Sequence, residues 1–175
     1  SDVCSSDLFI EGGWSGLPFA PDYGGQGLPK TLQFLVDEFV CSTNLSFGMY
    51  PGLSHGAYNA LELHGSDEQK GLYLPKLTDG TWSGTMCLTE PHSGTDLGLL
   101  RTSATDMGDG TWRINGSKIF ITSGHGNYHF VLAKTEDRDS LSALSLFLVR
   151  LKLERDGEVV VNAHVDRVEE KLGHK

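Results

Sequence analysis

The stretch Thr111-Trp-Arg-Ile-Asn-Gly-Ser-Lys-Ile-Phe-Ile-Thr122 carries the strongest indication of secondary structure in the chain. Asn115-Gly116 divides it into two runs that are rich in aromatic, β-branched and alternating apolar residues. Because Asn and Gly both tolerate positive φ, this dipeptide favours a type I′ turn between antiparallel strands. We therefore expect a β-hairpin over residues 111–122, preceded by a second tight turn at Asp109-Gly110.

Short runs with the composition of strands continue on both sides of this hairpin. Period-two alternation or β-branched runs, bounded by turn residues, predict a strand in each of them. They lie at residues 82–88, 102–106, 129–134, 144–149 and 159–165. Several short strands joined by turns are typical of a small barrel or sandwich, so we expect a mostly antiparallel, barrel-like β domain over residues 80–175.

Before residue 80 the periodicity is that of helices. The segment from Pro29 to Thr43 has apolar residues at helical spacing, which predicts a helix. We expect its apolar face to pack into the core, and the alternative is a face for a partner helix. A second helix is expected from His55 to Leu63. The capping box Ser66-Asp-Glu-Gln69 begins a third helix, which should stop before Pro75. The apolar face of the first helix consists of Leu32, Leu35, Val36, Phe39 and Val40.

Together these patterns predict an α+β chain, with a partial N-terminal helical domain over residues 14–79 in front of the β domain. The first residues, Ser1-Asp-Val-Cys-Ser-Ser-Asp-Leu8, lack the charged and apolar segments of a secretory signal. We expect residues 1–13 to be a non-native or disordered start, with no helix or strand in residues 1–8.

The composition narrows the class of protein. Lys+Arg 14 against Asp+Glu 23 gives a net charge of −9, which repels a nucleic-acid backbone and argues against a nucleic-acid partner. No run approaches the roughly 18 apolar residues that span a membrane. Cysteines at positions 4, 41 and 87 lack CxxC spacing and predict buried free thiols in a cytoplasmic protein.

Seven histidines raise the question of a metal site. His125 and His129 are four residues apart, but Gly124 and Gly126 oppose the helix that would align them. Because no cysteine lies nearby, we expect no metal site.

The segment Met86-Cys-Leu-Thr-Glu-Pro-His-Ser-Gly-Thr-Asp96 ends a strand-like run with an irregular turn that is rich in hydroxyl groups. Such a loop can offer backbone N–H groups and hydroxyls to a carbonyl-rich ring or to a phosphate. It can equally well satisfy only its own backbone. Turn chemistry alone favours the second interpretation.

Three motifs in register resemble the acyl-CoA dehydrogenase family. They are Pro21-Asp-Tyr-Gly-Gly-Gln-Gly-Leu28, Leu88-Thr-Glu-Pro-His-Ser-Gly-Thr-Asp96 and Asn115-Gly-Ser-Lys-Ile-Phe-Ile-Thr122, and Lys171-Leu-Gly-His-Lys175 is similar to the next landmark. The resemblance extends from about residue 14 to the end. Within the family, the segment Thr89–Arg101 is most similar to the 3-methylmercaptopropionyl-CoA dehydrogenase-like branch.

The resemblance implies an FAD-dependent enzyme that removes a proton and a hydride from adjacent carbons of an acyl-CoA thioester, with the hydride passing to flavin N5. Leu88 and Thr89 would contact the pyrimidine edge, and Thr122 the N5 region. Phe120 stands where most members have Trp and would stack on the ring. The implied cofactor-binding residues are Met86, Leu88, Thr89, Gly94, Thr95, Phe120, Ile121 and Thr122, and Thr95 would also contact the substrate.

The resemblance also implies a truncated chain. The family's catalytic base is a Glu in a C-terminal helical bundle, which we expect beyond Lys175, so the matched residues alone should be inactive. Glu90 would be a loop residue rather than that base. The implied partners are the acyl-CoA substrate, an electron-transfer flavoprotein or similar acceptor, and further copies in a homodimer or tetramer. The alternative is a non-catalytic module that binds flavin or acyl-CoA.

Overall fold

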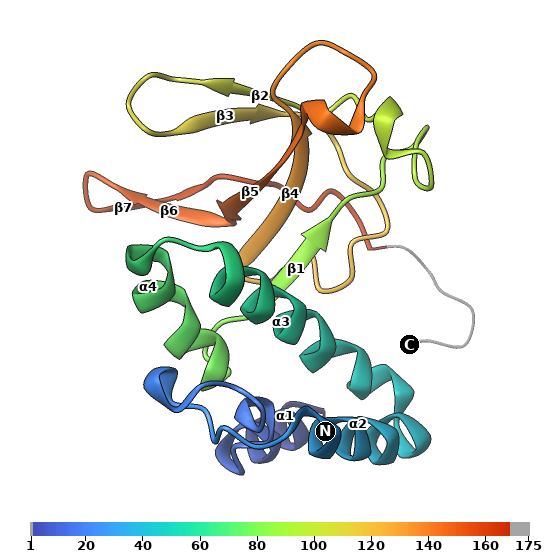
Figure 1. The fold of residues 1–175 in the computed structure, drawn as a ribbon, viewed down its shortest axis with the longest axis vertical. Helices are drawn as coiled ribbons and strands as arrows, with labels where there is room; N and C mark the ends of the chain where they lie inside the picture. Colours follow the sequence, from blue (N-terminus) through green and yellow to red (C-terminus); the bar gives the residue numbers. More distant parts are fainter. Residues whose placement is uncertain (1, 169–175) are drawn as a thin grey trace. The chain divides into compact units, whose positions relative to one another are not determined.

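The computed structural model describes residues 2–168 and consists of two compact units divided between Gly84 and Thr85. The first unit is helical, and the second contains a curled mixed sheet (Figure 1). The predicted α+β class is therefore confirmed.

The helical unit is built around a small aromatic core. Phe19 stacks on Tyr58 with ring centroids 3.7 Å apart, and the Tyr58 hydroxyl accepts a hydrogen bond from Ala20 N at 3.1 Å. A Cβ on Gly25 would lie 2.1 Å from Phe19 O, so only glycine allows the loop to pack so closely. The elements are α1 (Asp2–Glu11), two 3₁₀ turns η1 (Trp14–Gly16) and η2 (Pro21–Tyr23), α2 (Lys30–Thr43), α3 (Leu45–His64) and α4 (Asp67–Thr78).

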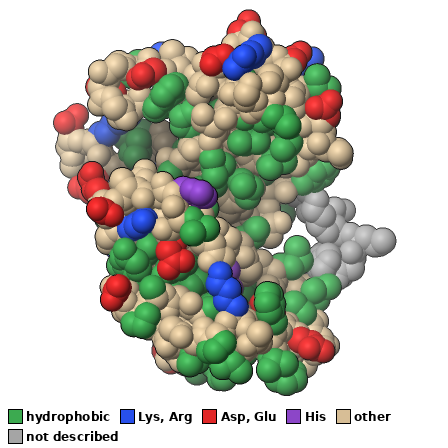
Figure 2. All heavy atoms as spheres, viewed as in Figure 1, with side chains coloured by type: hydrophobic (Ala, Val, Ile, Leu, Met, Phe, Trp, Pro, Cys, Tyr) green, Lys and Arg blue, Asp and Glu red, His purple; other side chains and the backbone are tan. Residues whose placement is uncertain are grey.

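The apolar face of α2 is exposed, which corrects the expectation that it packs into the core. Leu35 and Phe39 are 50% and 68% exposed, and the buried residue of the helix is Gln33. Hydrophobic side chains are accordingly visible at the surface of the helical elements (Figure 2). Helical spacing shows which residues share a face, but only tertiary contacts decide what covers it. Cys41 on this helix is also exposed, against the expectation of a buried thiol.

Two helices extend further than predicted, each through a proline. α3 begins at Leu45 rather than His55, because the Asn44 side chain accepts from Phe47 N at 3.0 Å and caps a longer helix that includes Pro51. The capping box that begins α4 is formed as predicted, but the helix passes Pro75 and ends at Thr78. Pro inside a helix costs about 3 kcal/mol. Burial of Leu74 and Leu77, at roughly 1.5–3 kcal/mol for each such side chain, offsets that cost.

Residues 2–11 form α1, although we expected no regular element in residues 1–8. Phe9 packs edge-on against Phe47, with ring centroids 5.4 Å apart. The helix ends where Gly12 N and Gly13 N donate to the carbonyls of Leu8 and Ile10. A tertiary contact, which local sequence patterns do not reveal, thus accompanies this helix.

The second unit is organised around one central strand, β4 (Tyr128–Lys134). β4 pairs with β1 (Gly84–Cys87), antiparallel along its whole length with β5 (Leu144–Arg150), and in parallel with β2 (Ser103–Asp106) at the single pair Ser103↔Lys134. Its residues are buried on both faces, as expected for a strand covered on each side. The remaining elements are η3 (Leu97–Leu99), β3 (Trp112–Asn115), η4 (Leu141–Ala143) and the separate hairpin β6 (Lys152–Arg155) and β7 (Glu158–Val161).

Of the two predicted hairpin turns, one forms and one does not. β2 and β3 pair from Asp106↔Trp112 to Ser103↔Asn115, across the predicted Asp109-Gly110 turn. β3 then ends at Asn115, and no strand follows over residues 116–122. Gly116 is not among the residues with positive φ. A Cβ there would lie 2.3 Å from Thr102 Oγ1, so this glycine permits a close approach of two segments instead of a type I′ turn.

Candidate functional site

The chain leaves β1 in a tight loop whose polar groups are largely hydrogen-bonded to one another. Glu90 N donates to Ser93 O at 2.7 Å, and Ser93 N donates back to Glu90 O at 3.1 Å. The buried Ser93 hydroxyl donates to the Asp96 carbonyl. The Asp96 carboxylate in turn accepts from Gly98 N at 3.1 Å and caps η3. For Ser93, the interpretation that the loop satisfies its own backbone is therefore the right one.

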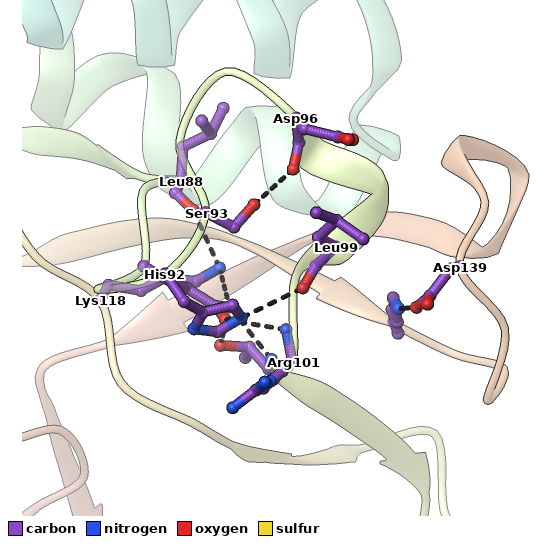
Figure 3. A network of polar contacts seen from close by, with 11 residues as sticks. Leu88, His92, Ser93, Asp96, Leu99, Arg101, Lys118 and Asp139 are labelled. Carbon is purple, nitrogen blue, oxygen red and sulfur yellow. Dashed lines mark hydrogen bonds and ion pairs between the residues drawn. The ribbon is translucent and has the colours of Figure 1, made fainter.

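Figure 3 shows the polar network around this loop, with Lys118 and Arg101 among its members. The Glu90 carboxylate accepts hydrogen bonds from three residues of this network. Its Oε2 accepts from Arg101 N at 2.8 Å. Its Oε1 accepts from Thr102 N at 3.0 Å, from Thr102 Oγ1 at 2.5 Å and from Lys118 Nζ at 2.8 Å. Only 3% of Glu90 is exposed. One buried carboxylate thus connects the loop to the start of β2 and to the segment after β3.

These donors keep Glu90 ionised. Burial by itself raises the pKa of the carboxyl, but the hydrogen bonds from Lys118, Thr102 and Arg101 N together lower it to about 2. A general base is effective when its pKa lies near the working pH. Glu90 is therefore suited to organise the loop and poorly suited to accept a proton from a substrate.

Lys118 joins two segments that are distant in sequence. Its side chain is 8% exposed, and its Nζ donates to Leu88 O at 3.1 Å as well as to Glu90. Beside it, Ile119 N donates to Thr89 O at 2.9 Å. The sequence analysis gave Lys118 no role of its own, although it lies within the motif Asn115–Thr122. The one available signal was a lysine directly before the apolar residues Ile119, Phe120 and Ile121.

The predicted cofactor residues of the first segment lie along the end of β1 and the loop. Met86 is 44% exposed and lies between two buried neighbours on the strand, so it points away from the core. Leu88, Thr89 and Gly94 are half-buried, and Thr95 is exposed.

The second predicted segment is attached directly to the first. The Thr85 hydroxyl donates to the Thr122 carbonyl at 2.5 Å, next to half-buried Ile121. Phe120 is 61% exposed and has a φ of 57°, a backbone conformation that costs energy in a bulky residue and is frequent at functional sites. Ser123 Oγ is buried without a hydrogen-bond partner among the described residues. The structure therefore brings the two predicted segments together.

The nucleophilic and metal-ligating side chains of this unit serve other roles. Burial raises the pKa of the Cys87 thiol to about 11, so it is neutral and buried as predicted. The ring N–H of His129 Nε2 donates to Gly124 O at 2.8 Å, and burial lowers the pKa of this imidazole. His92 Nε2 lies 3.1 Å from Leu99 O. Within residues 2–168, no group of three His, Cys, Asp or Glu side chains is arranged to hold a metal ion.

An open cleft of about 660 Å³ lies beside β2 and the end of β4, away from the predicted cofactor residues. Its walls carry both charges, with Arg101 and Lys134 opposite Glu136, Asp137 and Asp139. Lys134 Nζ lies 2.6 Å from Asp139 Oδ1, so part of this charge is already neutralised. None of the predicted site residues lines the cleft.

Among the described residues, none of the helices combines the length and apolar character that crossing a bilayer requires.

Comparisons with known proteins cover both units. Residues 7–81 match the acyl-CoA dehydrogenase N-terminal domain, and residues 85–175 match the acyl-CoA dehydrogenase middle domain. The chain is 45% identical to 3-methylmercaptopropionyl-CoA dehydrogenase of Ruegeria pomeroyi over 157 residues, which are 86% of this chain and 27% of the relative.

Solved structures share the fold. A chain from a structure of the electron transferring flavoprotein of Acidaminococcus fermentans, described in terms of flavin-based electron bifurcation, superimposes with a TM-score of 0.78 at 32% identity, over 82% of this chain and 38% of that one. A glutaryl-CoA dehydrogenase from Mycobacterium smegmatis in complex with FADH2 gives 0.70 at 29% identity, over 81% and 36%. The chain spans well under half of each of these proteins. With both domains matched in order, this protein belongs to the acyl-CoA dehydrogenase family.

Proposed function

We propose that the complete polypeptide containing these residues is an FAD-dependent acyl-CoA dehydrogenase. The observation that carries this proposal is the junction of two segments, residues 86–95 and 120–122, through the contacts of Thr85, Lys118 and Ile119. Each segment contributes half of the family's flavin-binding pattern, and the contacts hold the halves side by side. Bound FAD would supply the hydride acceptor that no amino-acid side chain can replace.

The residues present suit a flat, polar-edged ring. Phe120 is a 61% exposed aromatic residue, and Ser123 Oγ is a buried polar atom without a partner among the described residues, which a ligand could satisfy. We assign stacking to Phe120, polar contacts to Leu88, Thr89 and Thr122, and substrate contact to Thr95. Met86, Gly94 and Ile121 would complete the wall of the site.

The base that removes the α-proton is, in this proposal, a carboxylate outside the described residues. Glu90 has both oxygens occupied and a pKa of about 2. A positioned base contributes roughly 10²–10⁴-fold to such a reaction. The 175-residue chain alone should therefore show no turnover.

The substrate and partners follow from the relatives. The 45% identity to 3-methylmercaptopropionyl-CoA dehydrogenase favours an acyl-CoA substrate of that general kind. The likeness to a chain from an electron transferring flavoprotein structure supports a protein flavin as the electron acceptor. A homodimer or tetramer in the cytoplasm completes the proposal.

The alternative is a non-catalytic module that binds flavin or acyl-CoA, which the lowered pKa of Glu90 also permits. One experiment separates the two. The complete polypeptide and the 175-residue chain are purified, their bound flavin is identified by absorbance, and both are assayed with a dye acceptor and a panel of acyl-CoAs. Turnover by the complete polypeptide alone supports the proposal. Bound flavin without turnover favours the module, and absence of flavin from both refutes the site.

Thr122→Ala in the complete polypeptide tests the site more finely. Loss of one hydrogen bond costs about 1 kcal/mol, so FAD should bind roughly fivefold more weakly, with little effect on unfolding of the apoprotein. Unchanged affinity and an unchanged flavin spectrum would remove the Thr122 hydroxyl from the site.

A further inference from the structure

We propose that Glu90 and Lys118 form a positioning clamp, which fixes the backbone of Leu88 and Thr89 against residues 118–122 and so sets the pose of the flavin. This inference rests on the proposed function, because the clamped segments are those assigned to FAD. Neither clamp residue is assigned contact with the cofactor.

The geometry of the pair supports a role in position. Lys118 Nζ is shared between Glu90 Oε1 at 2.8 Å and Leu88 O at 3.1 Å. The second contact is to a backbone carbonyl of the proposed site, and Ile119 N binds the next carbonyl, that of Thr89, at 2.9 Å. Movement of the Lys118 ammonium would therefore release one of the two anchors of this backbone.

The free-energy cost of burying this ion pair also supports a role in positioning the backbone. The side chains of Glu90 and Lys118 are 2% and 8% exposed, and desolvation of both charges consumes most of their attraction. Apolar residues of similar volume often give equal or greater stability. They could not hold the Leu88 carbonyl in place, so we infer that the pair serves local geometry more than overall stability.

Glu90 extends the clamp to a third segment. Arg101 N and Thr102 N donate to its two oxygens at 2.8 and 3.0 Å, which fixes the far end of the loop at the start of β2. The Lys134–Asp139 pair in the same unit provides a contrast. Its distance is 2.6 Å, but Asp139 is 73% exposed and neither residue bonds to the proposed flavin segments.

The test uses the complete polypeptide and the variants Glu90→Gln, Lys118→Met, the double variant, and Asp139→Asn as the matched control. Apoprotein is titrated with FAD, the visible spectrum of the saturated protein is recorded, and thermal unfolding of the apoprotein is measured. Each single variant removes a hydrogen bond to a charged group within the clamp, and such a bond corresponds to about tenfold or more in an equilibrium constant. We expect that loss and an altered bound-flavin spectrum for both single variants, with neither change for Asp139→Asn.

The double variant separates position from stability. It leaves no unpaired buried charge, so the apoprotein should regain much of the thermal stability lost by the single variants. FAD affinity should stay low, because no donor remains for the Leu88 carbonyl. Recovery of wild-type affinity and spectrum by the double variant would overturn the clamp. So would single variants whose binding and spectrum match those of Asp139→Asn. A wild-type protein that binds no FAD would instead refute the proposed function itself.

Discussion

The α2 helix and the loop after β1 both depart from the usual rule that apolar side chains are buried and charged side chains are exposed. On α2, the apolar side chains of Leu35 and Phe39 are exposed and Gln33 is buried. In the loop, the charged side chain of Glu90 is buried and hydrogen-bonded to buried Lys118, which lies after β3. The first arrangement leaves apolar area for another surface to cover, whereas the second places polar groups where nothing further is needed. The polarity of its side chains alone therefore does not show whether a region needs a further contact to cover or pair them.

Of the changes to these two regions, removal of the Glu90 carboxylate from the loop should have the largest effect on stability. Glu90→Leu leaves Lys118 charged and unpaired and leaves Arg101 N and Thr102 N without acceptors. We expect a loss of about 3–5 kcal/mol in the free energy of unfolding, measured by denaturant titration of the complete polypeptide. A loss below about 1 kcal/mol would show that the network contributes little.

Acid should reveal the same network without mutation. The pKa of Glu90 is lowered from 4.5 to about 2, so its contribution is complete above pH 4.5 and disappears as the pH falls towards 2. By linkage this contribution is roughly 3 kcal/mol. The unfolding free energy of wild type should decline over this interval more steeply than that of Glu90→Gln, whose amide does not titrate. Parallel curves for the two proteins would contradict the lowered pKa.

Gly116→Ala tests the close approach that replaced the predicted turn. The new Cβ would lie 2.3 Å from Thr102 Oγ1 and 2.7 Å from Thr102 Cβ, and Thr102 is itself bonded to Glu90. We expect a loss of roughly 1–3 kcal/mol. Gly56→Ala is the matched control, since nothing lies within 4 Å of its Cβ position in α3, and it should stabilise by roughly 0.5–1 kcal/mol. Equal effects of the two changes would disprove the crowding.

The smallest effect is expected on α2. Phe39 is 68% exposed, so Phe39→Ser in the 175-residue chain should change the unfolding free energy by less than about 0.5 kcal/mol. The same substitution in the complete polypeptide tests whether another part of the protein covers the apolar face of α2. A loss of several kcal/mol there would mean that another part of the protein covers this face, and a second null result would leave it as free surface.

The sequence allowed prediction of those elements that depend on interactions between residues close together in the chain. The capping box at Ser66, the Asp109-Gly110 hairpin and the strands β4 and β5 depend on neighbours in the chain and were found. The prediction of a turn at Asn115-Gly116 was wrong, because Gly116 instead lies in close contact with Thr102. The motif resemblance located residues 86–95 and 120–122. It could not reveal that Lys118 connects them, since that contact depends on where the fold brings distant segments.

The hydrogen bonds that join these segments also have a consequence for the order of folding. Those of Lys118 and of Thr85 close separations of 28 to 37 residues, whereas the β2–β3 hairpin closes from Asp106 to Trp112. Long closures cost more chain entropy and tend to form later than local ones. Substitutions at Lys118 should therefore accelerate unfolding more than they slow refolding, and substitutions in the hairpin should do the reverse. Stopped-flow rates in denaturant would detect the difference, and a chain folding under unfavourable conditions would acquire the β2–β3 hairpin before it could hold a ligand.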